Sequence, residues 1–157
     1  MATVSLKSAL KRQFGNNPYG NLSVLSFALA TLASGAAADS DSTTAIAAGD
    51  VIDLGPLPEG LRLDDAQIIV STGMTATITG SLGFKYEDGV DSPEVPQDAA
   101  YFGAALSLAS IGRVRATGSK LLTLAKPARL ILTTAAAANA KASDINVVVF
   151  GEQLGAR

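Results

Sequence analysis

Apolar and polar side chains alternate strictly over residues 74–86, and no α-helix can accommodate that pattern. Methionine, alanine, isoleucine, leucine, phenylalanine, tyrosine and one glycine occupy every second position, with threonine, serine, glycine and lysine between them. A period of two belongs to a β-strand, whereas a helix repeats about every 3.6 residues. Gly80 lies in the middle of the run, and a glycine inside a strand pattern often marks a bend. The alternation predicts a half-buried strand or a hairpin bent at Gly80.

Short apolar runs elsewhere in the chain are separated by connections rich in glycine, proline and aspartate. Further strands are expected at residues 22–29, 51–54, 61–63, 66–70, 111–114, 120–124, 128–134 and 145–150. The Gly-Pro-Leu-Pro-Glu-Gly sequence at 55–60 predicts a tight connection, and the alanine-rich residues 135–142 predict a long hairpin loop. Many short strands at this spacing are typical of an all-β fold, an antiparallel β-sandwich or barrel.

Residues 87–98 are expected to form a solvated loop. The loop is rich in acids and is the one candidate for a hard cation such as calcium, with Glu87, Asp88, Asp91, Glu94 and Asp98 as the available ligands. Their spacing does not match an EF-hand loop, so we predict no metal site. Asp98 also offers a capping side chain just before Tyr101 and Phe102, which predicts one or two helical turns there.

The composition excludes most catalytic chemistry. The 157 residues include no histidine and no cysteine, which removes the commonest general base, the thiol nucleophile and the usual zinc ligands. Carboxylates for glycoside cleavage could come from Asp50, Asp53, Asp64 and Asp65, but such sites also need aromatic platforms. The chain has no tryptophan and only three tyrosines. It is therefore predicted not to be an enzyme and to use no cofactor.

The chain carries little charge, and this predicts assembly. Charged residues make up 17% of the sequence and the formal net charge is −2, whereas soluble domains average about 25% charged residues. The chain has no excess of positive charge that could neutralise phosphates, so no nucleic-acid partner is expected. Surfaces of serine, threonine and glycine suit burial against other subunits, which predicts a homo-oligomer, a trimer.

The uncharged segment Leu22–Ala38 follows three basic residues and imitates a secretory signal peptide. Pro18 and Gly20 separate the charges from the apolar run, and the run is short for a membrane span of about 20 residues. We interpret it as beginning with a strand and expect no membrane association. Residues 1–20 are predicted to be an extended N-terminal arm, and residues 21–157 a single β-sandwich domain.

Residues 48–66, with the sequence AGDVIDLGPLPEGLRLDDA, resemble a turn-and-strand motif of a group of tailed-bacteriophage virion proteins. A glycine-containing strand, Thr79–Phe84, and the short aromatic element Asp98–Phe102 continue the resemblance, which covers roughly residues 49–150. The resemblance implies a capsid decoration (cement, or auxiliary head) protein. Such proteins are often jelly-roll trimers at symmetry axes, with an N-terminal arm that reaches across to the shell.

The function expected from this resemblance is that of a non-enzymatic virion protein. It would bind the outer surface of a tailed-phage head, with the major capsid protein as its partner, and pass through the host cytoplasm during assembly. Another virion component (a head fibre base, neck or tail protein) is an alternative, and a secreted carbohydrate- or calcium-binding β-sandwich is a further one.

Five basic residues are candidates for contacts with the capsid or between subunits: Lys7, Lys11, Arg12, Arg113 and Arg115. The last two lie two positions apart and would share one face of a strand. They could meet the acidic 87–98 loop of a neighbouring subunit. The other interpretation is a strand face that is simply solvated.

Overall fold

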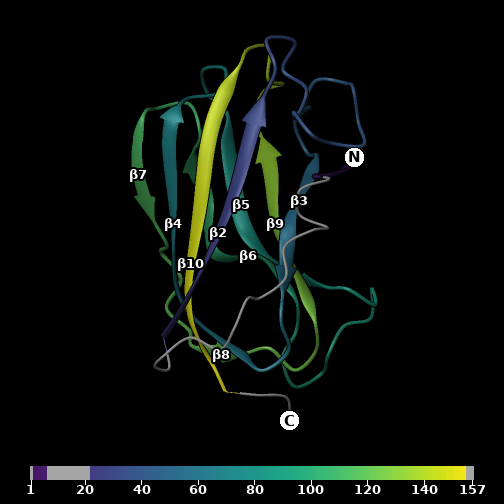
Figure 1. Ribbon diagram of the computed structural model, residues 1–157, viewed down its shortest axis with the longest axis vertical. Coiled ribbons are helices and arrows are strands. Elements are labelled where there is room, and N and C mark those ends of the chain that lie inside the picture. The colour runs from purple at the N-terminus through teal and green to yellow at the C-terminus, as the bar shows by residue number, and fades with distance from the viewer. Residues whose placement is uncertain (1, 7–21, 155–157) are drawn as a thin grey trace.

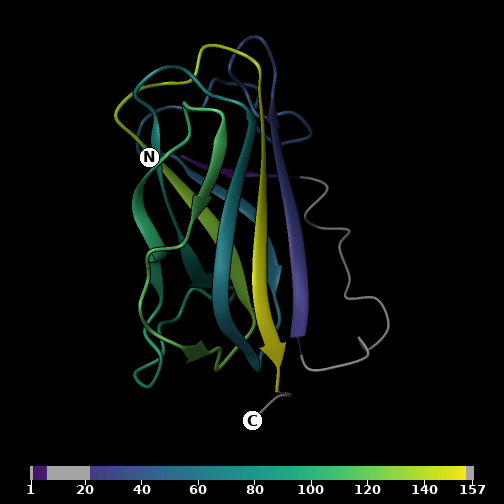
Figure 2. The same cartoon turned by 90° about the vertical axis from the view of Figure 1, so that its left-hand side faces the viewer.

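The computed structural model describes residues 2–6 and 22–154, and these fold into two β-sheets packed face to face, with no helix (Figures 1 and 2). The strands are β1 (Thr3–Ser5), β2 (Leu22–Thr31), β3 (Val51–Leu57), β4 (Leu61–Thr72), β5 (Thr79–Tyr86), β6 (Asp98–Ser107), β7 (Gly112–Arg115), β8 (Leu122–Thr123), β9 (Ala128–Ala135) and β10 (Ser143–Gln153).

The strand pairing makes the sandwich a jelly roll. Strand β2 pairs with β10, β3 with β9, β4 with β7 and β5 with β6, all antiparallel. These nested pairs form one long hairpin that folds over on itself and brings β10 against β4 and β9 against β5. The two sheets therefore run β2-β10-β4-β7 and β3-β9-β5-β6, with β8 beside β4 and β1 beside β3. The predicted antiparallel, jelly-roll-like sandwich is confirmed.

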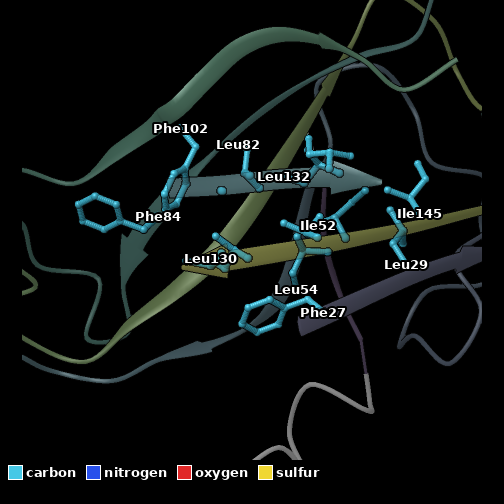
Figure 3. Packing of buried hydrophobic residues seen from close by; sticks show 14 of the residues in the cluster. Phe27, Leu29, Ile52, Leu54, Leu82, Phe84, Phe102, Leu130, Leu132 and Ile145 are labelled. Atoms are coloured by element: carbon cyan, nitrogen blue, oxygen red, sulfur yellow. The ribbon is translucent and has the colours of Figure 1, made fainter. Parts of the chain in front are cut away.

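The core lies between the two sheets and is filled by every second residue of the strands (Figure 3). On β2, Phe27 and Leu29 point inward while Val24 and Ser26 are exposed. On β5, Leu82 and Phe84 are fully buried, as the alternation predicts. Because one face of each strand supplies the core, a shift of one residue in register would expose it.

Strand β1 pairs in parallel with β3, and Val4 within β1 and Leu6 just after it are buried. This part of the predicted N-terminal arm therefore packs on the body of the sandwich. The candidate contact residues Lys7, Lys11 and Arg12 lie outside the described residues.

Three local predictions are wrong. Tyr101 and Phe102 lie in strand β6 rather than in a helical turn. Asp98 does accept a hydrogen bond from the Ala100 amide, but pairing with β5 keeps the following backbone extended.

The 74–86 alternation is neither one strand nor a hairpin bent at Gly80, because a turn precedes strand β5 and gives Thr77 a positive φ. Residues 136–142 form a loop that crosses between the sheets and not a hairpin, because β9 and β10 pair with other strands.

Tyr101 ties strand β6 to the opposite sheet. Its hydroxyl oxygen lies 3.1 Å from the Leu63 carbonyl oxygen and 2.5 Å from that of Lys120. Its ring packs edge-to-face on Phe84 and Phe102. Burial, with a smaller effect of the Asp64 carboxylate, raises the pKa of Tyr101 to about 12.

Replacing Tyr101 with phenylalanine is expected to cost about 1 kcal/mol of stability at neutral pH, because the two carbonyls lose their donor. The wild-type protein should also lose stability between about pH 10 and pH 12, since Tyr101 then ionises more readily in the unfolded chain than in the folded one. The variant should lose less over that range. Urea unfolding at pH 7, 10 and 12 tests this, and parallel curves for the two proteins would contradict it.

Candidate interaction surfaces

The carboxylates considered for catalysis are occupied by structural contacts. Asp53 binds Arg129, Asp64 binds Arg62 and Asp65 binds Arg115. Asp50 is buried and accepts hydrogen bonds from the backbone amides of Ala2 and Ala47. Asp50, Asp53 and Asp65 thus join different segments of the chain, whereas Asp64 pairs with Arg62 within strand β4.

The acidic 87–98 loop is folded on itself. Asp88 accepts a hydrogen bond from the Val90 amide and forms an ion pair with Lys126, and these contacts, the first above all, lower the pKa of Asp88. Asp91 accepts hydrogen bonds from two backbone amides of the same loop. In the described ranges 2–6 and 22–154, no three acidic, histidine or cysteine side chains gather as metal ligands would, and no helix is long and apolar enough to cross a membrane.

The outer face of the β2-β10-β4-β7 sheet is unusually apolar along strand β2. The exposed positions of that strand hold leucine, valine, serine and two alanines, without a charge. Val24 lies opposite Phe150, and Ser26 lies opposite Val148, both half-buried on β10. We call this surface the β2 face, made of Leu22, Val24, Ser26, Ala28, Val148 and Phe150. An outer sheet face is normally polar in a monomer, so the β2 face is suited to contact with another subunit.

Strand β2 also forms one edge of its sheet. In the described part of the chain, its only ladder partner is β10. It carries no lysine, proline or bulge, the features that usually block pairing of an edge strand with another chain. The edge therefore adds backbone donors and acceptors to the apolar β2 face.

Arg113 and Arg115 lie on β7, at the opposite edge of the same sheet, and share its outer face. Arg113 donates to the Gln67 side chain at 2.8 Å, and Arg115 forms an ion pair with Asp65 at 2.6 Å. The Arg115 side chain is 77% exposed. Both residues are available for contacts outside the chain, although Asp65 already neutralises Arg115.

The outer face of the other sheet contains a buried ion pair. The Nε of Arg129 lies 3.0 Å from both carboxylate oxygens of Asp53, and the side chains are only 11% and 10% exposed. Ile131, opposite Asp53 on β9, is buried as well. This region is therefore enclosed, unlike the β2 face.

At one end of the sandwich, the upper end in Figure 1, hydrogen bonds join several of the connections to one another. We call it the loop end; it comprises residues 32–50, 73–78, 108–111 and 136–142. The buried Asn139 accepts hydrogen bonds from the amide and hydroxyl of Thr75 and donates to the Thr31 hydroxyl and the Lys141 carbonyl. The backbone amide of Asn139 donates a hydrogen bond to the Ile46 carbonyl. Three connections are thus fixed to one another.

Sequence reasoning missed Asn139. It appears as one amide in an alanine-rich run, and its partners lie more than 60 positions away in the chain for Thr75 and more than 100 for Thr31. The signal in the sequence was a single asparagine within a run of alanines. If such a side chain is buried, its amide must find hydrogen-bond partners, so it marks a candidate contact between segments.

No family model matches the sequence, and no curated protein matches it either. Among solved structures, the chain is similar to a chain from the capsid of Ralstonia phage GP4, with a TM-score of 0.68, 21% identity and 99% of both chains covered. It is also similar to a chain from the capsid asymmetric unit of cyanophage Pam1, with a TM-score of 0.56, 18% identity and coverage of 91% of this chain and 94% of that one. These similarities establish a fold shared with chains of phage capsids.

Proposed function

We propose that this protein is a non-enzymatic decoration protein of a tailed-phage head that binds the outer surface of the shell and stabilises it. The observation that carries the proposal is the likeness to a chain of the Ralstonia phage GP4 capsid over 99% of both chains. The occupied carboxylates and the apolar β2 face agree with a role in assembly. The partner would be the major capsid protein, and the location the virion surface.

Such a protein would act by mass action. The protein would bind only to the closed lattice, across neighbouring capsomers. This binding would raise the free energy needed to open the lattice, by an amount set by the protein's affinity and concentration. No residue needs to react, and many shape-matched contacts suffice.

Purified virions of the phage that encodes the chain provide the test. Mass spectrometry should find the protein in intact particles, and cryo-electron microscopy should locate it on the outside of the head. Heads that lack it should open at lower temperature and regain stability when it is added back. Its absence from virions would overturn the proposal, and density at the neck or tail would favour another virion component.

We also propose that the chain forms a homotrimer through the β2 face. Burying the exposed Leu22 and Val24 side chains, with Phe150 beside them, would remove apolar surface from water. A closed cyclic assembly would also cover the β2 edge in every copy.

Replacing Val24 with lysine is expected to dissociate the trimer, because the new ammonium group would lose its hydration in the interface. Val24 is already 55% exposed in the single chain, so the fold of each subunit should remain intact. Val90→Lys, at a residue of 60% exposure in the acidic loop, is the matched control and should remain trimeric. Light scattering measures both masses. A monomeric wild-type protein, or an unaffected Val24→Lys variant, would contradict the proposal.

A further inference from the structure

We propose that the space occupied by strand β1 is a binding site for an extended peptide segment, and that in the homotrimer this segment comes from a neighbouring copy of the chain. We call this space, between β3 and residues 40–41, the β1 slot. In the single chain it holds the chain's own residues 2–6. The inference rests on the proposed homotrimer and adds to it the exchange of one strand between copies.

Residues 2–6 are bound along their backbone on both sides. On one side, β1 pairs in parallel with β3. On the other side, the Asp41 carboxylate accepts a hydrogen bond from the Ser5 amide at 2.9 Å, and the Asp41 amide donates to the Ser5 carbonyl at 3.1 Å. At the start of the segment, the Ala2 amide donates to the buried Asp50 carboxylate at 2.9 Å. The β1 slot thus holds a short extended backbone between two lines of hydrogen bonds.

The side chains of the segment alternate between the core and the solvent. Val4 and Leu6 are each 2% exposed and belong to the core between the sheets, whereas Thr3 is exposed. Main-chain hydrogen bonds combined with buried sites for alternate side chains are the features by which proteins bind a peptide as an added strand. The β1 slot is therefore suited to an extended segment with apolar residues at the positions of Val4 and Leu6.

The contacts of β1 do not depend on which copy supplies the strand. The partners named above, and the bridge from Leu6 to Ser40, all lie within residues 40–53, which belong to the body of the sandwich. A β1 strand from another copy would form the same contacts, and domain swapping of this kind is a low-cost route to an oligomer. Residues 7–21 connect Leu6 to Leu22, and a chain of that length spans up to about 50 Å when extended.

Strand β1 is also more easily released than the other long-range pairings of the fold. It is three residues long and pairs in parallel, and parallel pairing is slightly less stable per residue than antiparallel pairing. Its departure exposes Val4 and Leu6 and leaves the rest of the core between the sheets. Segments with few buried apolar contacts open at a lower free energy than the whole fold.

The β1 slot lies on the side of the sandwich where the copies of the trimer would meet. Strand β2 lies beside β3 of the other sheet. The segment 38–41 contacts both β2 and β1, because the Ala38 amide donates to the Ala30 carbonyl of β2 and Asp41 binds Ser5. A trimer joined through the β2 face therefore brings this side of each copy close to a neighbour. If each copy passes its strand to the next, the ring closes with every slot filled.

Cysteine cross-linking tests the inference, because the chain has no cysteine of its own. Thr3 is exposed and lies opposite the half-buried Val51 in the β1–β3 ladder. The full-length variants Thr3→Cys and Val51→Cys are unfolded, mixed, refolded together and oxidised. Exchange of strands is expected to link them as covalent heterodimers, with twice the mass of one chain on a non-reducing gel. Thr3→Cys mixed with Val90→Cys is the matched control, since Val90 is 60% exposed outside the β2 face, and should give no heterodimer above background.

The double variant Thr3→Cys/Val51→Cys shows directly which copy fills each slot. With exchange, oxidation should link the chains into species of two and three times the mass of one chain. Without exchange, the disulfide closes within each chain, so the free thiols disappear while the mass stays that of one chain. That result, or the persistence of both free thiols after oxidation, would overturn the inference.

The other proposals are tested separately. If light scattering shows a wild-type trimer and the double variant forms disulfides only within chains, the homotrimer stands and strand exchange fails. A monomeric wild-type protein would overturn both. Cross-linking uses free protein without heads, so none of these outcomes affects the proposed decoration of the shell, which the virion experiments test.

Discussion

Replacing Arg129 with methionine is expected to destabilise the protein by about 3–5 kcal/mol, because the Asp53 carboxylate is then left enclosed without its partner. The two side chains are 11% and 10% exposed, and both carboxylate oxygens lie 3.0 Å from the Arg129 Nε. Removing one charge therefore leaves the other with little access to water. Urea unfolding at a fixed protein concentration measures the loss.

The exposed pair between Arg115 and Asp65 is the matched control. Arg115 is 77% exposed, so Arg115→Met is expected to cost about 0–1 kcal/mol. The double variant Asp53→Val/Arg129→Met should recover most of the loss, since replacing both members of a buried pair by apolar residues is often neutral. Equal effects of Arg129→Met and Arg115→Met, or no recovery in the double variant, would contradict the role assigned to the buried pair.

Replacing Asn139 with alanine is expected to cost about 2–4 kcal/mol and to loosen the loop end. The Thr75 amide loses its acceptor, and the Thr31 hydroxyl and the Lys141 carbonyl lose a donor. The Thr75 amide is left without a partner, which costs about 1–3 kcal/mol, while the Thr31 hydroxyl and the Lys141 carbonyl keep their hydrogen bond to each other but lose a further one. Thermal unfolding measures the stability, and hydrogen exchange should show faster exchange at Thr75 while the β10 amides stay protected.

Asn146→Ala provides the comparison for this prediction. Asn146 is half-buried on the outer side of β10, and its replacement is expected to change stability by about 0.5 kcal/mol or less. If both asparagine variants behave alike, or if exchange rises evenly along the chain, Asn139 does not organise the loop end.

Much of the fold could be predicted from local pattern. Residues 22–29 and 145–150 are short, largely apolar runs, and both form strands of one sheet. The turn at 55–60 follows from glycine and proline chemistry, although the structure extends β3 through Leu57 before the turn. The errors occurred where a distant partner overrode a local signal. Asp98 bonds the Ala100 amide as a cap would, yet pairing with β5 makes Tyr101 part of a strand.

The candidate surfaces were predicted less well. Arg113 and Arg115 share a face, as their spacing predicted, but their bonds to Gln67 and Asp65 depend on the register between β4 and β7. The apolar β2 face was hidden because Val24 and Phe150 are far apart in sequence and meet only through strand pairing.

By itself, the sequence determined that the chain forms short strands, buries aliphatic side chains between them and lacks histidine and cysteine chemistry, because side-chain period and composition are local properties. Only the tertiary structure decided the jelly-roll pairing, the enclosed Asp53–Arg129 pair, the Asn139 contacts and the apolar β2 face. These depend on which strands and connections are brought together. The pairing of strands and connections minimises the free energy of the whole chain, so no single segment of the sequence determines it.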